Sequence, residues 1–408
     1  MFFKKINKNS IYSFLSQVFV VFQSFLLLLI VTRYVDTFDF GVYTLCLTAV
    51  TFLTGFFLQP LIQSYMVYAQ DDTSIINSVN QHIKSSIFLS IIFGCSCIFL
   101  GFLLNENILL FGLIILLFIF EALRGYILAY LNIIKDFKKM AVVSFFLIFR
   151  PILILIFYIF NESTLSMMYA SILSLVINLF LSCRSELNMI FRSQFDSSVN
   201  LKPFYQYSIN IFPSKIMYWC YYNFDKITIS FFFGPSILGL YAPIFNFIYQ
   251  IYFLIHMSLT NFFRPYIYED FKVNKLFFIK RYSWITILSF LIILLFTTNS
   301  FFIEFLKVFL GKEYHVLLNI IPSISLLCAL MTFTFAFEMI YLPTKKINLL
   351  WKMQLVIFLL FVPIILIFFK NLNVDQLIHY FIFWNMILIL FLLIGSLKTI
   401  KNYFIMKI

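Results

Sequence analysis

The chain has 408 residues, of which 62% are hydrophobic and only 11% are charged. Soluble globular domains carry about 25% charged and about 45–50% apolar residues, so a water-soluble fold is excluded. The net charge of +12 does not indicate nucleic-acid binding, because the charges form no basic domain and instead separate long apolar blocks, as loop charges do. The composition therefore predicts an all-α membrane protein.

Apolar blocks of about 20 residues, the length at which a helix crosses the hydrocarbon core, recur along the chain. Helices satisfy their own backbone hydrogen bonds, which lipid requires, so the blocks predict twelve transmembrane helices. In chain order the predicted spans are 11–32, 41–68, 84–104, 108–133, 141–160, 164–182, 204–233, 238–262, 283–303, 315–340, 349–369 and 377–397. We expect the first block to be a mature span, because it is too long for a signal peptide and has no small-residue cleavage site.

The distribution of lysine and arginine indicates how the spans are oriented. With the N-terminus in the cytoplasm, the cytoplasmic segments hold 21 of the 29 Lys and Arg residues and the outer segments hold four. Cytoplasmic loops of membrane proteins carry such an excess. We therefore expect both termini in the cytoplasm and an even number of spans. The predicted loops are too short to form a soluble catalytic domain.

Four short matches, in the same order in both halves of the chain, predict an internal repeat. They are Phe40-Gly41-Val42-Tyr43 with Leu238-Gly239-Leu240-Tyr241, Gln59-Pro60 with Arg264-Pro265, Tyr130-Leu131 with Tyr341-Leu342, and Pro151 with Pro363. Their offsets lie between 198 and 212 residues, about half the chain. We expect two pseudo-symmetric six-helix bundles, residues 1–200 and 201–408, with a substrate path between them. The alternative is coincidence in a chain rich in Phe, Leu and Ile.

Charged side chains inside the predicted spans mark candidate functional positions. A charge at the centre of the membrane costs roughly 2.5–3.5 kcal/mol, so each such group must face water, a partner or a ligand. The charged residues inside spans are Glu121, Arg124, Arg150, Lys215, Asp225, Lys226 and Glu338.

The seventh span carries the most informative pattern. Lys215, Trp219, Tyr222 and Lys226 are spaced by four, three and four residues, so they share one helix face. Two cations beside two aromatic rings suit a ligand with an anionic group and sugar rings. The alternative is that one lysine pairs with a neighbouring helix while Lys226 reaches the membrane interface.

Polar stripes on the other central spans extend this pattern. Gln17 on the first span corresponds to Lys215 at the repeat offset of 198, and Gln250 lies on a polar face of the eighth span. The stripes comprise Ser13, Gln17 and Ser24, then Thr44, Thr48, Thr51, Gly55 and Gln59, then Asn246, Gln250, Asn261 and Arg264. They are expected if these helices line one cavity, although polar residues also hold membrane helices together.

Arg150 lies near the middle of its span with no carboxylate within one turn, so a ligand phosphate or a distant acid is needed to balance it. Glu121 and Arg124 are three residues apart and can form an ion pair along their helix. Asp225 and Glu338, together with Glu121, are the candidates for ion or proton coupling.

The sequence contains no pattern typical of an enzyme or a metal site. It has no Gly-rich phosphate loop and no His-Glu helix motif, and its six cysteines show no zinc-ligand spacing. We therefore expect a protein without a cofactor or metal that catalyses no reaction.

Three groups of residues carry a resemblance to a known family. They are Arg33 with Phe40-Gly41-Val42-Tyr43, then Asn223-Phe224-Asp225-Lys226 followed by Gly239-Leu240-Tyr241, and finally Leu310-Gly311-Lys312-Glu313-Tyr314. In the order and spacing of these motifs, the chain resembles the O-antigen (Wzx-type) polysaccharide flippases over nearly its whole length. These belong to the multidrug/oligosaccharidyl-lipid/polysaccharide (MOP) exporter superfamily.

The resemblance implies a MATE/MOP-like, V-shaped pair of bundles in the bacterial inner membrane. It implies a flippase that moves an undecaprenyl-pyrophosphate-linked oligosaccharide, the O-antigen or a similar unit of lipopolysaccharide biosynthesis, from the cytoplasmic to the periplasmic leaflet by alternating access. Membrane lipids, an O-antigen polymerase and a chain-length regulator are the expected partners, and nucleic acid is not. The expected substrate-binding residues are Arg124, Arg150, Lys215, Trp219, Tyr222, Lys226, Gln17 and Gln250.

Three other classes of function stay open, of which a purely structural role, for example as an assembly scaffold, would tolerate neutralising every cavity charge. A MATE-type cation-coupled multidrug antiporter of the same superfamily would favour acidic over basic groups in its cavity. A membrane enzyme such as an O-antigen polymerase or ligase would carry a large outer loop, which the predicted spans do not leave room for.

Overall fold

The computed structural model describes residues 8–68, 108–192, 202–272, 276–341, 344, 347–368 and 373–405. Nearly all of these residues are helical, and none of them forms a strand, so the expected all-α class is confirmed. The predicted third span, 84–104, lies outside the described residues.

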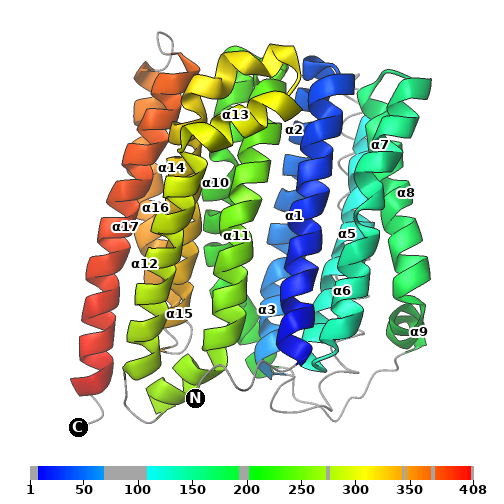
Figure 1. The fold of residues 1–408 in the computed structure, drawn as a ribbon. Helices are drawn as coiled ribbons and strands as arrows, with labels where there is room; N and C mark the ends of the chain where they lie inside the picture. Colours follow the sequence, from blue (N-terminus) through cyan, green and yellow to red (C-terminus); the bar gives the residue numbers. More distant parts are fainter. Residues whose placement is uncertain are drawn as a thin grey trace. The chain divides into compact units, whose positions relative to one another are not determined.

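The helices follow the predicted spans in chain order (Figure 1). They are α1 (Lys8–Tyr34), α2 (Thr37–Leu53), the π-helix η2 (Thr54–Leu58), α3 (Gln59–Tyr68), α5 (Ile108–Ile133), α6 (Phe137–Phe146), α7 (Phe149–Phe160), α8 (Thr164–Ser182), α9 (Arg184–Arg192), α10 (Lys202–Phe233), α11 (Pro235–Lys272), α12 (Phe277–Thr297), α13 (Ser300–Phe309), the 3-10 helix η3 (Lys312–Ile320), α14 (Ile321–Ala336), α15 (Glu338–Tyr341), α16 (Ile347–Phe368) and α17 (Val374–Ile405).

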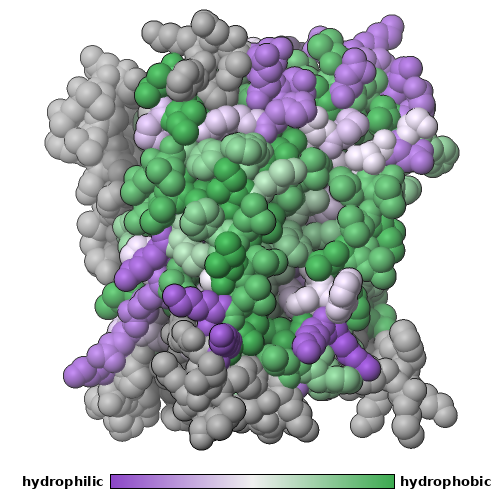
Figure 2. Space-filling view, turned by 90° about the vertical axis from the view of Figure 1, so that its left-hand side faces the viewer, coloured by the Kyte–Doolittle hydropathy of each residue, from purple (hydrophilic) through white to green (hydrophobic). Residues whose placement is uncertain are grey.

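Ten helical segments of the described residues are long and apolar enough to cross a membrane. The 32-residue α10, which matches the predicted seventh span, is not among them because its charged and polar residues lower its hydropathy. Figure 2 shows a face on which hydrophobic residues fill a broad band with hydrophilic residues beyond both of its edges. Large apolar side chains are exposed on the long helices, including Leu295 of α12 (71%) and Ile394 of α17 (65%). This is the surface of a multi-pass membrane protein.

The chain forms two compact units whose boundaries fall inside helices. Unit 1 comprises Met1–Leu26 and Val42–Trp219, and unit 2 comprises Leu27–Gly41 and Cys220–Ile408. In unit 1, α8 packs against α5, α6 and α7. In unit 2, α14 packs against α11, α12 and α17, and α13 lies across the end of α12 (Figure 1). The six-helix bundles 1–200 and 201–408 stay a prediction.

A proline explains the break between α6 and α7. Pro151 has no N–H to continue the α-helical hydrogen bonds, and its ring clashes with the carbonyl four residues earlier. The chain takes tighter bonds before it, from the N–H of Ile148 to the carbonyl of Phe145 (3.0 Å) and from Arg150 to Leu147 (3.0 Å). The break places Arg150 in the first turn of α7, where its side chain is buried.

Reciprocal glycine contacts join the starts of α2 and α11 within unit 2. A Cβ atom added at Gly41 would overlap the backbone carbonyl of Pro235, and one added at Gly239 would overlap the carbonyl of Thr37. Thr37 and Pro235 are themselves 198 residues apart, as Gly41 and Gly239 are. The contact therefore follows the internal repeat, with each motif packing its glycine against the backbone of the other.

The end of α1 is held against α13 and η3 by a third glycine and an arginine. A Cβ at Gly311 would overlap the carbonyl of Thr32. Next to it, Arg33 donates hydrogen bonds from Nε to the carbonyl of Phe309 (3.1 Å) and from Nη2 to that of Val308 (3.0 Å). These carbonyls lie at the C-terminal end of α13, where the helix itself offers no donors and a cation is favourable.

We expect Gly41→Ala and Gly239→Ala each to destabilise the protein by about 1–3 kcal/mol, because a methyl group forces two backbones apart. Thermal unfolding of the purified full-length chain in detergent measures the effect. Gly112→Ala is the matched control, since a Cβ there has no atom within 4 Å. Equal melting temperatures for all three variants would contradict the interpretation of the glycine contacts.

Candidate functional site

The buried guanidinium group of Arg150 is held by three helices other than its own, all in unit 1. Its Nη1 lies 3.1 Å from Oε1 of Glu121 on α5. Its Nη2 donates to the hydroxyl of Tyr43 on α2 (3.1 Å), and its Nε to the hydroxyl of Ser171 on α8 (3.3 Å). Tyr43 and Ser171 are themselves hydrogen-bonded at 2.6 Å. The distant acid left open by the sequence is therefore Glu121.

Glu121 is shared between two arginines. Its Oε2 accepts hydrogen bonds from Nη2 of Arg124 at 2.7 Å and from Nε at 3.0 Å, so the pair expected from the spacing forms along α5. Its Oε1 faces Arg150. The exposed fractions of the three side chains are 21% (Arg124), 18% (Glu121) and 11% (Arg150). Two cations and one anion leave this cluster, the arginine cluster, with a formal charge of +1.

Sequence reasoning identified the charged members of the arginine cluster but missed its hydroxyl groups. Tyr43 belongs to the repeated motif that opens the second span, and that motif was the signal available for it. Ser171 carries no signal, because serines are common in membrane helices and only the packing of α7 on α8 brings it to Arg150.

The face predicted for α10 is divided between the two units. Lys215 and Trp219 belong to unit 1, and Tyr222 and Lys226 belong to unit 2. In unit 1 the indole Nε1 of Trp219 donates to the carbonyl of Thr48 (3.2 Å) and to the hydroxyl of Thr51 (3.2 Å). The ammonium group of Lys215 lies 5.1 Å from the centre of the Tyr218 ring.

The π-helix η2 begins one turn after Thr51, next to Trp219. The N–H of Gln59 donates to the carbonyl of Thr54, five residues back. Gly55 lies against Trp219, because a Cβ added at Gly55 would be 3.9 Å from the Cβ of Trp219. Such single-turn π segments are frequent at functional sites. Here the segment shapes the surface of α2 on which the tryptophan packs.

In unit 2, Asp225 and Lys226 are buried side by side, with 2% and 3% of their surface exposed. Lys226 Nζ lies 4.0 Å from Asp225 Oδ1, and Asp225 Oδ2 accepts a hydrogen bond from Tyr241 at 2.7 Å. The ammonium group also lies over the rings of Tyr222 (3.9 Å) and Phe245 (4.4 Å). The burial of Lys226 contradicts the interpretation that it reaches the membrane interface.

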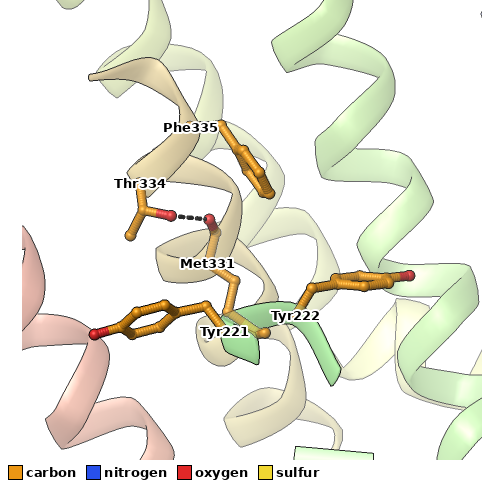
Figure 3. A pocket seen from close by; sticks show the side chains of 5 residues that line it. All are labelled: Tyr221, Tyr222, Met331, Thr334 and Phe335. Carbon is orange, nitrogen blue, oxygen red and sulfur yellow. Dashed lines mark hydrogen bonds between the residues drawn. The ribbon is translucent and has the colours of Figure 1, made fainter. Parts of the chain in front are cut away.

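A small cavity opens beside this pair within unit 2. It has room for about one water molecule and is lined by Tyr221, Tyr222, Met331, Thr334 and Phe335. Figure 3 shows that the neighbouring tyrosines point in opposite directions from α10. The hydroxyl of Thr334 is tied to the carbonyl of Met331 (2.7 Å). The lining is therefore mostly apolar, and the cavity is too small to hold a sugar ring.

The remaining predicted site residues lie apart from these clusters. Gln17 is a half-buried residue of α1 in unit 1, and Gln250 is a half-buried residue of α11 in unit 2. Glu338 begins the short helix α15, after a break in the helix at Phe337. In the described part of the chain, no three His, Cys, Asp or Glu residues are grouped so as to hold a metal ion.

Comparison with known proteins identifies the family. The sequence matches the family described as polysaccharide biosynthesis protein over residues 6–271, which is more than half of the chain. No curated protein matches the sequence significantly.

Solved structures show the same fold. A multidrug resistance MATE family transporter of the MOP superfamily, in an outward-facing conformation, aligns with a TM-score of 0.68 and 10% identity, covering 97% of this chain and 95% of that one. A MOP superfamily transporter from Pyrococcus furiosus aligns with a TM-score of 0.68 and 13% identity over the same shares. The lipid II flippase MurJ, in an inward closed conformation, aligns with a TM-score of 0.66 and 14% identity, covering 98% and 91%. At these identities the likeness establishes a MOP-type fold alone.

Removing the shared acid of the arginine cluster should be costly. We expect Glu121→Gln to destabilise the protein by about 3 kcal/mol, because it leaves two arginines without their acid. This value is the lower end of the range for a broken buried ion pair, since the Glu121 side chain is 18% exposed. Glu304→Gln is the matched control, since Glu304 pairs with Lys307 on the surface and is 69% exposed. Thermal unfolding in detergent compares the two variants, and equal melting temperatures would contradict a structural role for Glu121.

Proposed function

We propose that this chain, which belongs to the polysaccharide biosynthesis protein family, is a flippase for an undecaprenyl-pyrophosphate-linked oligosaccharide. The O-antigen or a similar repeat unit would pass from the cytoplasmic to the periplasmic leaflet of the bacterial inner membrane by alternating access. Both termini would lie in the cytoplasm, with an O-antigen polymerase and a chain-length regulator as partners. No bond is broken, so the protein lowers the cost of carrying polar groups through hydrocarbon.

The observation that carries this proposal is the excess positive charge of the arginine cluster. Glu121 balances one of the two arginines that contact it, and among the described residues no second acid forms a salt bridge with either arginine. An excess charge inside a membrane protein is expensive unless a ligand of opposite sign balances it. A diphosphate does so with strong, charge-assisted hydrogen bonds, for which the planar guanidinium group is well suited.

Other predicted residues supply contacts of the kind that the sugar part needs. Trp219 carries an aromatic ring within unit 1, and its indole N–H donates to α2. Lys215 lies four residues earlier on α10 and adds a positive charge. Tyr222, Gln17 and Gln250 are half-buried and offer a ring and amide groups. The polyprenyl tail stays in lipid. Ion or proton coupling is assigned in this proposal to Glu121 or Glu338, while Asp225, the third candidate, lies against Lys226 and Tyr241.

Arg124→Ala tests the proposal most directly. It removes the excess charge and leaves the Glu121–Arg150 pair intact, so the cluster becomes neutral without an unpaired buried acid. We expect surface glycan to fall on the order of tenfold at normal membrane abundance, since a charge-assisted hydrogen bond contributes about 1.5–3 kcal/mol. Glycan is measured by gel electrophoresis of extracted lipopolysaccharide.

Arg281→Ala is the matched control, because Arg281 is an exposed arginine at the start of α12 and stacks on Phe277 at 4.0 Å. It should leave surface glycan unchanged. Unchanged glycan in Arg124→Ala would remove the arginine cluster from substrate transport. Efflux of a fluorescent cation by the wild-type chain, with no glycan defect when the chain is deleted, would instead favour the multidrug antiporter.

A further inference from the structure

The buried pair of unit 2 differs from the arginine cluster in having no excess charge. Asp225 and Lys226 are neighbours on α10, and both are almost fully enclosed. The contacts of the lysine are unusual for an ion pair. Within the described part of the chain, its ammonium group donates a hydrogen bond to the carbonyl of Tyr222 at 2.9 Å, one turn earlier on the same helix, and lies 4.0 Å from the carboxylate of Asp225.

Aromatic ring faces complete the surroundings of the ammonium group. The ring centres of Tyr222 and Phe245 lie 3.9 and 4.4 Å from Lys226 Nζ, well within the range of a cation–π interaction. A carboxylate, a carbonyl and two ring faces thus surround one nitrogen, and ring faces are also what aromatic cages use to bind ammonium ligands. We call these groups, from Asp225, Tyr222 and Phe245, the ammonium box.

Packing of α10 against α11 holds the walls of the ammonium box in place without help from the lysine. Tyr241, Phe245 and Tyr249 recur every four residues on one face of α11. Phe245 and Tyr249 are stacked with centres 5.9 Å apart and planes 11° apart, and Tyr249 also contacts Tyr222 at 4.6 Å. Tyr241 holds the carboxylate of Asp225 in place. The box should therefore keep its shape when the lysine side chain is shortened.

The ammonium box offers few oxygen ligands. Hard metal cations take about six or more oxygen atoms, whereas the groups here provide one carboxylate oxygen and one carbonyl beside two hydrocarbon rings. Rings attract an ammonium group, which needs few hydrogen-bond acceptors once it is desolvated. The donor set thus selects ammonium over a metal ion.

We propose that the box formed by Asp225, Tyr222 and Phe245 is a binding site for a primary ammonium ion whose permanent occupant is Lys226, so that Asp225 takes up no metal ion. This inference does not depend on the identity of the transported lipid. It removes Asp225 from the candidates for ion or proton coupling, because Lys226 is the permanent counter-ion of its carboxylate.

Lys226→Ala tests the proposal, because it empties the ammonium box and leaves the walls and Asp225 in place. Methylammonium chloride should raise the melting temperature of the purified full-length variant by about 2–4 °C at saturating concentration, since a ligand of the folded state stabilises it. Sodium chloride at equal ionic strength should not. The wild-type chain and Asp225→Asn/Lys226→Ala should show no difference between the two salts.

Two results would overturn the proposal. One is a Lys226→Ala variant that responds equally to methylammonium and sodium. The other is that sodium stabilises the wild-type chain but does not stabilise an Asp225→Asn variant, because Asp225 would then bind a metal ion. Neither measurement involves transport, so a failure of the flippase proposal leaves both outcomes unaffected.

A second variant covers the case in which Lys226→Ala fails to accumulate. Asp225→Asn/Lys226→Met removes both charges and keeps the side-chain volumes, and buried ion pairs replaced in this way often retain stability. We expect normal membrane abundance, and a melting temperature in detergent that does not differ between sodium chloride and methylammonium chloride at equal ionic strength. A wild-type chain that sodium stabilises while this double variant is not stabilised would show that Asp225 binds a metal ion and would overturn the proposal.

Discussion

The absence of water from the hydrocarbon core governs the placement of every charge in this protein. A charged group on a membrane-spanning helix must find its counter-charge inside the chain or on a ligand, because no solvent is present to replace it. The two buried clusters meet this constraint in different ways. Arg124 and Arg150 share one glutamate across two helices, whereas Lys226 and Asp225 are consecutive residues of one helix enclosed by aromatic rings.

The two clusters therefore differ in net charge and in how far they are exposed. The arginine cluster keeps one positive charge and is partly accessible, and in the proposed function it attracts and releases an anion without leaving a buried acid unpaired. The Asp225–Lys226 pair is neutral and almost fully buried, and it connects α10 to the start of α11 through Tyr241 and Phe245. A transporter needs both properties, since a ligand must be bound reversibly while the helices that carry it keep their packing.

What could be predicted from the sequence was decided by the range of each interaction. The spans and the Glu121–Arg124 pair follow from spacing along one helix, which the order of residues fixes. The contact of Arg150 with Glu121 depends on which helices pack together, and a single sequence does not contain that information. Lys226 was placed on the face of Lys215 by the same helical spacing, but its burial depends on α11, whose aromatic face is hidden in a chain with 58 phenylalanines.

The motifs that carried the family resemblance have a structural explanation that limits what they can say about function. Three of them contain Gly41, Gly239 and Gly311, and at each of these positions a Cβ would overlap a backbone carbonyl of unit 2. Such residues are constrained by the approach of one backbone to another, whatever the protein transports. Motifs of this kind therefore predict a MOP-type fold, which relatives with as little as 10% identity share. We propose that the choice of substrate depends instead on side chains outside these glycine contacts, such as Arg124, which contacts Glu121 through its charged group.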